Sequence, residues 1–197
     1  MRVNEIFYSI QGEGRNAGTP AVFVRFSGCN LKCPFCDTDF SFYTEMSEEE
    51  ILDKINKYKC DFVVLTGGEP TLQVTPKLLE LLRKSGKYIA IETNGTRQID
   101  AKLYDWVTVS PKYRFVSAKT QLNRLINEVK LVANLQTTQE WLSEAENNLH
   151  ANYYYLQPCD TGETEKNKEI IEHVITLVKE NPTWKISIQL HKMLGVR

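Results

Sequence analysis

Short apolar segments alternate with polar or glycine-rich loops and with helical segments, and this order constrains the fold more than any other feature of the chain. The apolar segments predict strands over residues 3–10, 21–28, 62–65, 88–91, 106–109, 127–132, 153–156 and 184–190. Helices are predicted over residues 47–58, 76–85, 138–148 and 164–180. Strands that alternate with helices in this way favour a parallel sheet with right-handed crossover connections.

The size of the predicted sheet indicates an incomplete barrel. About six mainly parallel strands fall short of the eight strand–helix units, about 250 residues in all, of a closed barrel. Residues 100–136 also show little helical pattern. We therefore expect an α/β fold with an incomplete, open (β/α) barrel. We also expect residues 1–197 to form a single domain, because no linker or repeat divides them.

The composition excludes several classes of function. The net charge of −1 and the pI of about 6.3 do not indicate electrostatic binding to nucleic acid. No apolar run reaches the roughly 18 residues that span a bilayer, and residues 1–5 begin no signal peptide. We therefore expect a cytoplasmic protein without a membrane partner. Cysteines stay reduced in the cytoplasm, so clustered cysteines indicate a metal or catalytic site rather than disulfides.

Three of the five cysteines lie within eight residues, as Cys29, Cys33 and Cys36 in a CxxxCxxC spacing. A tetrahedral zinc site normally has four protein ligands, and no fourth cysteine or histidine lies nearby. A cubane iron–sulfur cluster can instead be held by three thiolates, which leaves one iron open to another ligand. The spacing therefore predicts an iron–sulfur cluster and leaves open what occupies its fourth iron.

Polar or glycine-rich loops follow the predicted strands, and a parallel sheet brings such loops together at one edge. The loops expected to meet there contain the three cysteines and residues 67–70, 92–94, 110–112 and 157–158. Arg25 stands inside an apolar strand, where it can pair with a structural carboxylate or hold an anionic substrate group. The turn at residues 11–14 can be a plain connection or a surface that closely approaches a ligand.

The cysteine spacing after one strand and the Gly-Gly-Glu-Pro sequence after the next resemble the radical S-adenosylmethionine (SAM) superfamily. A closer resemblance, to the 7-carboxy-7-deazaguanine synthase family, covers nearly the whole chain. The matching segments are residues 5–14, 20–25, 36–38, 66–70, 92–95, 110–112, 156–158 and 189–192. The resemblance implies a fold of the radical SAM type and a lyase of queuosine and 7-deazapurine biosynthesis. Such a lyase converts 6-carboxy-5,6,7,8-tetrahydropterin to 7-carboxy-7-deazaguanine with loss of ammonia.

The resemblance also implies cofactors and residue roles. Cys29, Cys33 and Cys36 would bind a 4Fe–4S cluster whose open iron binds SAM, and Thr38 would bind Mg²⁺. The cluster and SAM would supply the radical that removes the hydrogen at carbon 6 of the pterin. SAM would contact the following residues: Phe35, Cys36, Asp37, Gly67, Gly68, Glu69, Ser110, Pro111, Lys112, Gln157, Pro158, Cys159 and Asp160. The pterin would contact Ile10, Gln11, Gly12, Arg25 and Thr66.

Two alternatives remain open from the sequence. One is a radical SAM activating enzyme that acts on a protein partner, and the other is a non-catalytic module stabilised by zinc. Arg25 and the turn at residues 11–14 favour a small anionic substrate. The resemblance further implies a homodimer and an external electron donor of the flavodoxin or ferredoxin type. Arg197 does not clearly match a family position, so we assign it no role.

Overall fold

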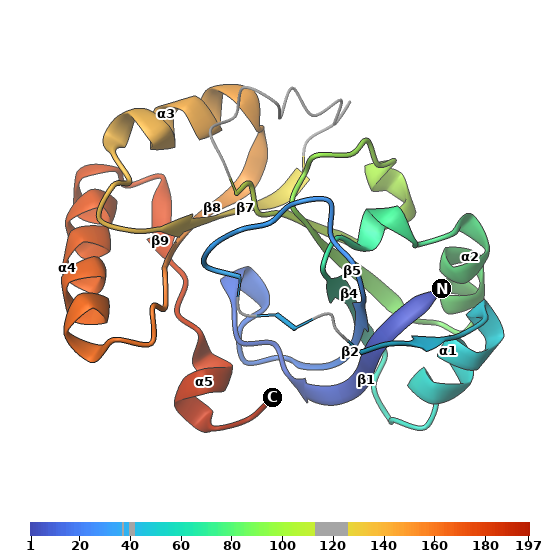
Figure 1. Cartoon of the computed structure of the whole chain (residues 1–197). Coiled ribbons are helices and arrows are strands. Elements are labelled where there is room, and N and C mark those ends of the chain that lie inside the picture. The colour runs from blue at the N-terminus through green and yellow to red at the C-terminus, as the bar shows by residue number, and fades with distance from the viewer. Residues whose placement is uncertain (37, 40–41, 113–125) are drawn as a thin grey trace.

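One sheet organises the computed structural model, which describes residues 1–36, 38–39, 42–112 and 126–197 (Figure 1). Its strands are β1 (Arg2–Ile10), β2 (Pro20–Phe26), β3 (Thr44–Glu45), β4 (Phe62–Gly67), β5 (Tyr88–Thr93), β6 (Trp106–Val109), β7 (Ile126–Ala133), β8 (Ala151–Pro158) and β9 (Trp184–Ile186). Their order in the sheet is β3-β1-β2-β4-β5-β6-β7-β8-β9. β1 pairs antiparallel with β2 and β3, whereas every pair from β2 to β9 is parallel.

The predicted open, mainly parallel sheet is confirmed, because β3 and β9 lie at opposite ends of the strand order and do not pair. The sheet has more strands than the predicted six or so. Eight of its nine strands lie in segments predicted as strands, including the antiparallel β1 and the short β9, and only the two-residue β3 was not predicted. Figure 1 shows that the sheet is strongly curved and that the C-terminal segment returns toward β1.

The helices are α1 (Glu48–Ile55), α2 (Pro76–Lys84), α3 (Gln139–Asn148), α4 (Thr164–Glu180) and α5 (Leu190–Leu194). The first four occupy the predicted helical segments. α1 begins with the capping box that its sequence favours, because Ser47 N donates to Glu50 Oε2 at 2.8 Å and Glu50 N donates to Ser47 Oγ at 3.2 Å. The connection between β5 and β6 holds only the short 3₁₀ helix η3 (Ala101–Leu103), so a barrel helix is missing there.

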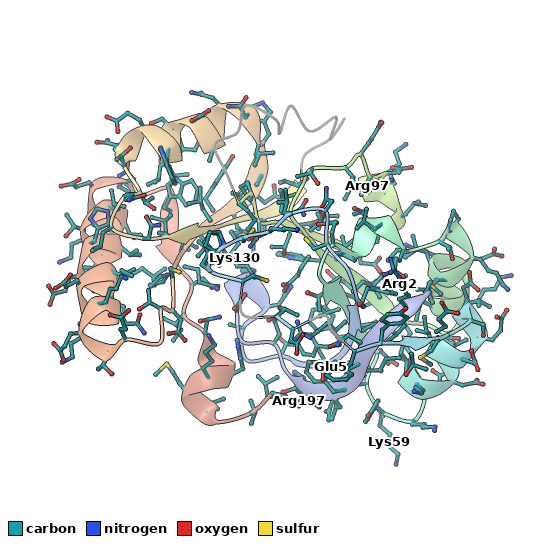
Figure 2. All side chains as sticks on the ribbon, viewed as in Figure 1. Arg2, Glu5, Lys59, Arg97, Lys130 and Arg197 are labelled. Atoms are coloured by element: carbon teal, nitrogen blue, oxygen red, sulfur yellow. The ribbon has the colours of Figure 1, made fainter. Side chains whose placement is uncertain are left out.

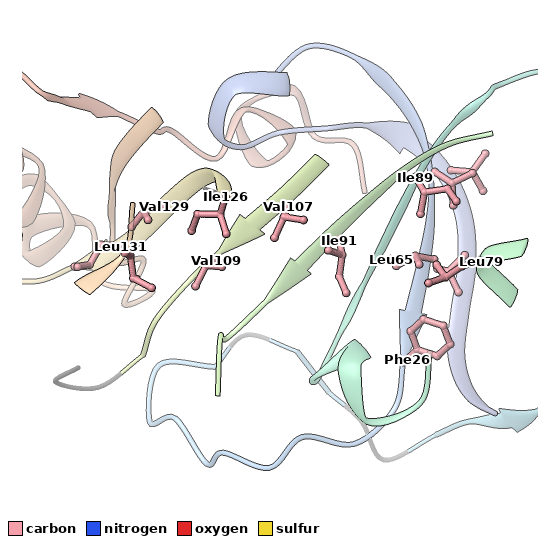
Figure 3. Packing of buried hydrophobic residues seen from close by; sticks show 14 of the residues in the cluster. Phe26, Leu65, Leu79, Ile89, Ile91, Val107, Val109, Ile126, Val129 and Leu131 are labelled. Carbon is pink, nitrogen blue, oxygen red and sulfur yellow. The ribbon is translucent and has the colours of Figure 1, made fainter. Parts of the chain in front are cut away.

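The main core lies between the sheet and the outer helices (Figure 3). The parallel strands supply a row of fully buried aliphatic side chains that includes Leu65, Ile91 and Val129. Leu82 of α2 and Val174 of α4 close the same core from outside and are also fully buried. Each such side chain stabilises the fold by roughly 1.5–3 kcal/mol relative to an exposed one. This packing fixes the strand ends on which the polar loops stand.

The predicted strand over residues 184–190 is wrong beyond Ile186. β9 pairs with β8 only through Ile186, although Ser187 N still donates to Leu156 O at 2.8 Å. α5 then begins at Leu190, whose N–H donates to Gly12 O at 2.9 Å. The apolar alternation at residues 186, 188 and 190 is typical of a strand. The contact of Leu190 with the turn after β1 nevertheless ends the pairing between β9 and β8. As a result, the C-terminal segment packs against the turn after β1. No helix in the described ranges is long and apolar enough to cross a membrane.

Candidate active site

A cavity of about 250 Å³ opens at the carboxyl ends of the parallel strands, where such folds place their chemistry. The strands contribute lining residues at or just beyond their ends: Thr66, Thr93, Ser110, Val132 and Gln157. The C-terminal segment closes one wall with Gln189, His191 and Arg197. The cavity therefore joins loops that lie far apart in the sequence.

The structure brings together most of the residues that the sequence predicted for one site. The predicted residues that line the cavity are Ile10, Gln11, Gly12, Arg25, Cys29, Cys33, Phe35, Cys36, Thr38, Thr66, Gly67, Gly68, Ser110, Lys112, Gln157, Pro158, Cys159 and Asp160. Glu69 and Pro111 are buried but are not part of this lining. Asp37 lies outside the described residues. Which of these residues contact SAM and which contact the pterin remains a prediction.

The three cysteines face this cavity from the loop after β2. Leu31 N approaches Cys29 Sγ at 3.4 Å, and Cys36 N donates to Cys33 O at 3.1 Å. All five cysteines lie in the described ranges, and none of them forms a disulfide. Among the described residues, no group of three or more Cys, His, Asp or Glu side chains is arranged to hold a metal ion. Three thiols without a fourth protein ligand suit a cubane, in which each thiolate binds a different iron, better than one tetrahedral ion.

The Gly-Gly-Glu loop after β4 packs directly on the start of the cysteine loop. Gly68 N donates to Phe26 O at 3.0 Å, and Glu69 N donates to Gly28 O at 2.9 Å. A Cβ atom on Gly68 would clash with the Gly28 carbonyl oxygen, so only glycine permits this approach. The family resemblance implies that Gly68 contacts SAM. The structure shows that it also lets two loops approach each other.

The Glu69 side chain holds loops together instead of facing the cavity. It is fully buried, and Oε1 accepts from Thr71 Oγ1 at 2.6 Å and from Thr93 Oγ1 at 2.7 Å. Oε2 accepts from the Asn94 backbone N–H at 2.7 Å. These bonds tie the loop after β4 to the loop after β5. The Glu69 carboxylate is therefore engaged by protein donors, and a contact of Glu69 with SAM stays a prediction.

Arg25 has the structural carboxylate that the sequence allowed for, and it also lies at the cavity. Its Nε donates to Glu5 Oε1 at 2.9 Å, so it has a structural carboxylate, and its side chain also lines the cavity. Glu5 Oε2 pairs with the guanidinium of Arg197. Both arginines lie over the Phe7 ring, at 5.7 Å for Arg25 and 5.2 Å for Arg197. Sequence reasoning missed Arg197, because nothing in the chain signals that residue 197 returns to β1.

A second group of charges that sequence reasoning missed surrounds Lys130 of β7. Its Nζ pairs with Glu13 Oε2 and lies 3.5 Å from Glu92 Oε2. Lys130 is labelled in Figure 2. Gln11 Nε2 donates to the other oxygen of Glu92 at 2.8 Å. A lysine inside an apolar strand is the same signal that singled out Arg25, so the pattern could have identified Lys130 as a residue that needs a partner.

The electrostatics of this group follow from burial and pairing. Burial would raise the pKa of Glu13, but the charge and hydrogen bond of Lys130 outweigh it and lower the pKa to about 2. Burial would lower the pKa of Lys130, but Glu13 and Glu92 raise it above its ordinary value. Glu128 stands two residues earlier on β7, and burial raises its pKa to about 7 despite a hydrogen bond from Arg15 N. Lys130 is thus a fixed cation among three carboxyl groups.

Polar contacts hold the remaining walls. Lys112 Nζ donates to Ser110 Oγ at 2.7 Å, and burial lowers the pKa of this lysine. Lys192 of α5 donates to Asp160 Oδ2 at 2.8 Å and joins the C-terminal helix to the loop after β8. A Cβ atom on Gly12 would clash with His191, so this glycine allows the C-terminal segment to pack against the cavity.

Comparison with known proteins supports the family resemblance that the sequence motifs indicated. The radical SAM superfamily matches residues 23–113. The 7-carboxy-7-deazaguanine synthase of Bacteroides thetaiotaomicron is 43% identical over 196 residues, which are 100% of this chain and 98% of that protein. The synthase of Haemophilus influenzae is 37% identical and covers 100% of this chain and 94% of its own length.

A structural likeness extends over the same length. The crystal structure of QueE from Escherichia coli has a TM-score of 0.80 and 29% sequence identity. The match covers 96% of this chain and 94% of that chain. These likenesses do not favour the protein-activating or zinc-stabilised alternatives.

Proposed function

The chain belongs to the 7-carboxy-7-deazaguanine synthase family of radical SAM enzymes, and we propose that its cavity carries out the reaction of that family. The reaction contracts the ring of 6-carboxy-5,6,7,8-tetrahydropterin and gives 7-carboxy-7-deazaguanine and ammonia. The observation that carries the proposal is the common cavity. One cavity is lined by the cysteines, the glycine loop, the arginine and the polar strand ends, which the sequence predicted separately.

The cysteine loop would hold the 4Fe–4S cluster. Cys29, Cys33 and Cys36 supply three thiols and no fourth ligand, which fits a cluster that leaves one iron open. The N–H of Leu31, directed at Cys29 Sγ, is of the kind that stabilises a cluster thiolate and tunes its potential. The chemistry that the cluster and SAM supply when bound is a carbon-centred radical able to remove a hydrogen atom from carbon 6 of the substrate.

The walls beside the cysteines would hold SAM. Gly67 and Gly68 place backbone polar groups at the cavity, and the opposite wall offers Ser110, Lys112 and Gln157. Gly67 has a φ of 130°, a backbone conformation open to glycine and to few other residues. These residues bind and orient SAM beside the cysteine loop, and the apolar ring of Phe35 shields it from water.

The substrate would lie between Arg25 and the turn after β1. Arg25 presents a guanidinium that suits the 6-carboxylate, while Glu5 and the Phe7 ring fix its orientation. Ile10, Gln11, Gly12 and Thr66 line the neighbouring wall and would hold the ring. Thr38 lines the same cavity, and its hydroxyl would be one ligand of a Mg²⁺ ion that completes its shell with substrate oxygens and water.

Three wider features complete the proposal. The whole chain would act as one radical SAM domain, since one sheet contains all nine strands of the described residues. It would act as a homodimer on a small pterin, and a flavodoxin-like or ferredoxin-like protein would supply the electron. It would work in the cytoplasm, where cysteines that form no disulfide stay reduced.

Turnover of the reconstituted enzyme tests the proposal. The protein is purified without oxygen, loaded with iron and sulfide, reduced, and given SAM, Mg²⁺ and 6-carboxy-5,6,7,8-tetrahydropterin. We expect 7-carboxy-7-deazaguanine and ammonia, with a lower rate when Mg²⁺ is removed. Tetrahydropterin without the carboxylate serves as the matched control and should give no ring-contracted product. A colourless protein that contains zinc and no iron, or a loaded enzyme that gives no product, would contradict the proposal.

A further inference from the structure

Lys130 is the most enclosed cation at the cavity among the residues described. It lies within β7, and its side chain is only 4% exposed. It reaches Glu13 from the turn after β1 and Glu92 from β5, at sequence separations of 117 and 38 residues. Both carboxylates and the lysine line the cavity. One buried cation therefore connects three parts of its wall.

The two carboxylates differ in how many donors already occupy them. Glu13 Oε1 accepts from Gln157 Nε2 at 3.0 Å and from Gln189 Nε2 at 2.9 Å, and its Oε2 pairs with Lys130. Glu92 has one close donor, Gln11 Nε2, and a longer contact with Lys130. A carboxylate offers about four lone-pair sites. Glu92 therefore retains acceptor capacity at the cavity, whereas Glu13 is largely taken up by the protein.

We propose that Lys130 is a positioning residue that holds Glu92 in the orientation in which its carboxylate accepts N–H groups of a 2-amino-4-oxopyrimidine ring. Glu13, anchored by Gln157 and Gln189, fixes the lysine, and the lysine in turn fixes Glu92. This inference rests on the proposed function, because the pterin ring is the part of the substrate that carries such N–H donors. Planar, paired acceptors recognise planar, paired donors with high geometric specificity.

The charges around Lys130 decide what its loss would do. Glu13, Glu92 and Glu128 attract it, while Lys112 lies near enough to interact with it and His191 interacts with Glu13. Replacement of Lys130 by methionine removes the cation and leaves Glu13 buried without it. The burial that Lys130 now outweighs would then raise the pKa of Glu13. Breaking a buried pair on one side in this way is strongly unfavourable.

Binding of 6-carboxypterin, an oxidised pterin that cannot undergo the reaction, tests the inference on the loaded, oxygen-free enzyme. Lys130→Met should weaken binding about 10- to 100-fold at pH 7. The loss should be largest at low pH and shrink as pH rises, because the unpaired carboxyl groups ionise only at higher pH. In turnover, KM for the substrate should rise more than kcat falls. Lys84→Met, which removes an exposed pair with Glu80, is the matched control and should change neither quantity.

A double variant keeps the test valid if Lys130→Met does not fold. Glu13→Gln combined with Lys130→Met removes the cation together with its main counter-charge, so folding should recover. Binding should stay at least about tenfold weaker, because Glu92 has lost its anchor. Wild-type affinity in the double variant, or an unchanged affinity and pH profile in Lys130→Met, would overturn the inference. If the wild type itself neither binds 6-carboxypterin nor forms product, the proposed function fails instead.

Discussion

Two sides of one cavity carry their charges in different ways. On the arginine side, formed by Glu5, Arg25 and Arg197, one carboxylate serves two guanidinium groups, and the Arg197 side chain is 71% exposed. On the carboxylate side, formed by Glu13, Glu92 and Lys130, one buried cation serves two carboxylates. Figure 2 shows Glu5 and Arg197 together and Lys130 well apart from them. The arginine side carries surplus positive charge and the carboxylate side surplus negative charge.

This difference matches the two ends of the proposed substrate. A 6-carboxylated pterin has an anion at one end and N–H donors at the other. Arg25, partly exposed and held by one side of Glu5, has donors left for the anion. Lys130 has its charge committed to the protein and acts only through the carboxylates it holds. A cation at a binding site thus contacts a ligand or organises the groups that do, depending on how many partners enclose it.

The largest effect is expected from the loss of a cluster ligand, which should abolish SAM cleavage but leave pterin binding at both sides of the cavity. Cys33→Ala should lower SAM cleavage below detection, because two thiols cannot replace the three-thiolate set of a cluster. Product analysis for 5′-deoxyadenosine, together with the visible spectrum of the protein, measures this loss. Binding of 6-carboxypterin should persist, since neither side of the cavity includes Cys33. SAM cleavage at the wild-type rate would disprove the ligand assignment.

The next prediction separates the two sides from each other. Arg25→Gln should weaken binding of 6-carboxypterin about 10- to 100-fold, because a charged hydrogen bond to the carboxylate is lost. Titration of pterin fluorescence measures both ligands, and binding of unsubstituted pterin should change little. Lys130→Met should weaken both ligands alike. If Arg25→Gln weakened both equally, the assignment of the carboxylate to this side would be wrong.

Glu128, which lies beside the carboxylate side on β7, should also limit the stability of the fold at high pH. Its folded-state pKa of about 7 exceeds the ordinary value of 4.5, so the folded state binds the proton more tightly than the unfolded state. Stability should therefore fall as pH rises from 4.5 through about 7. Glu128→Gln should remove this fall and raise the free energy of unfolding at pH 8 by roughly 3 kcal/mol. Oxygen-free denaturant unfolding at pH 5 and pH 8 measures it, and equal gains at both values would contradict the titration.

The smallest effect is expected on the arginine side. Arg197→Gln removes an exposed pair with Glu5, and such pairs contribute at most about 1 kcal/mol. Affinity for 6-carboxypterin should fall less than about fivefold, because Arg25 keeps its own contact with Glu5. A loss as large as that of Arg25→Gln would make the two arginines equal partners and would remove the distinction between them.

Much of the fold followed from local pattern. Alternating apolar and polar segments predicted the parallel strands, and the capping box at Ser47 marked the start of α1. The end of β9 did not follow, because the alternation after Ile186 continues while the pairing partner does not. That boundary depends on Gly12, a residue of another loop whose carbonyl accepts from Leu190 N. At this point a long-range contact overrides the local strand propensity.

For the site, the sequence by itself determined which loops line the common cavity. Residues that follow parallel strands must gather at one edge, so Cys29, Gly68 and Ser110 could be placed in one cavity before any coordinates. Only the tertiary structure decided the direction of each side chain and the pairing of each charge. It turned the Glu69 carboxylate away from the cavity and brought Glu13 to Lys130 across 117 residues. The physical reason is that a buried charge takes its partner from neighbouring strands, and strand order is a property of the whole sheet.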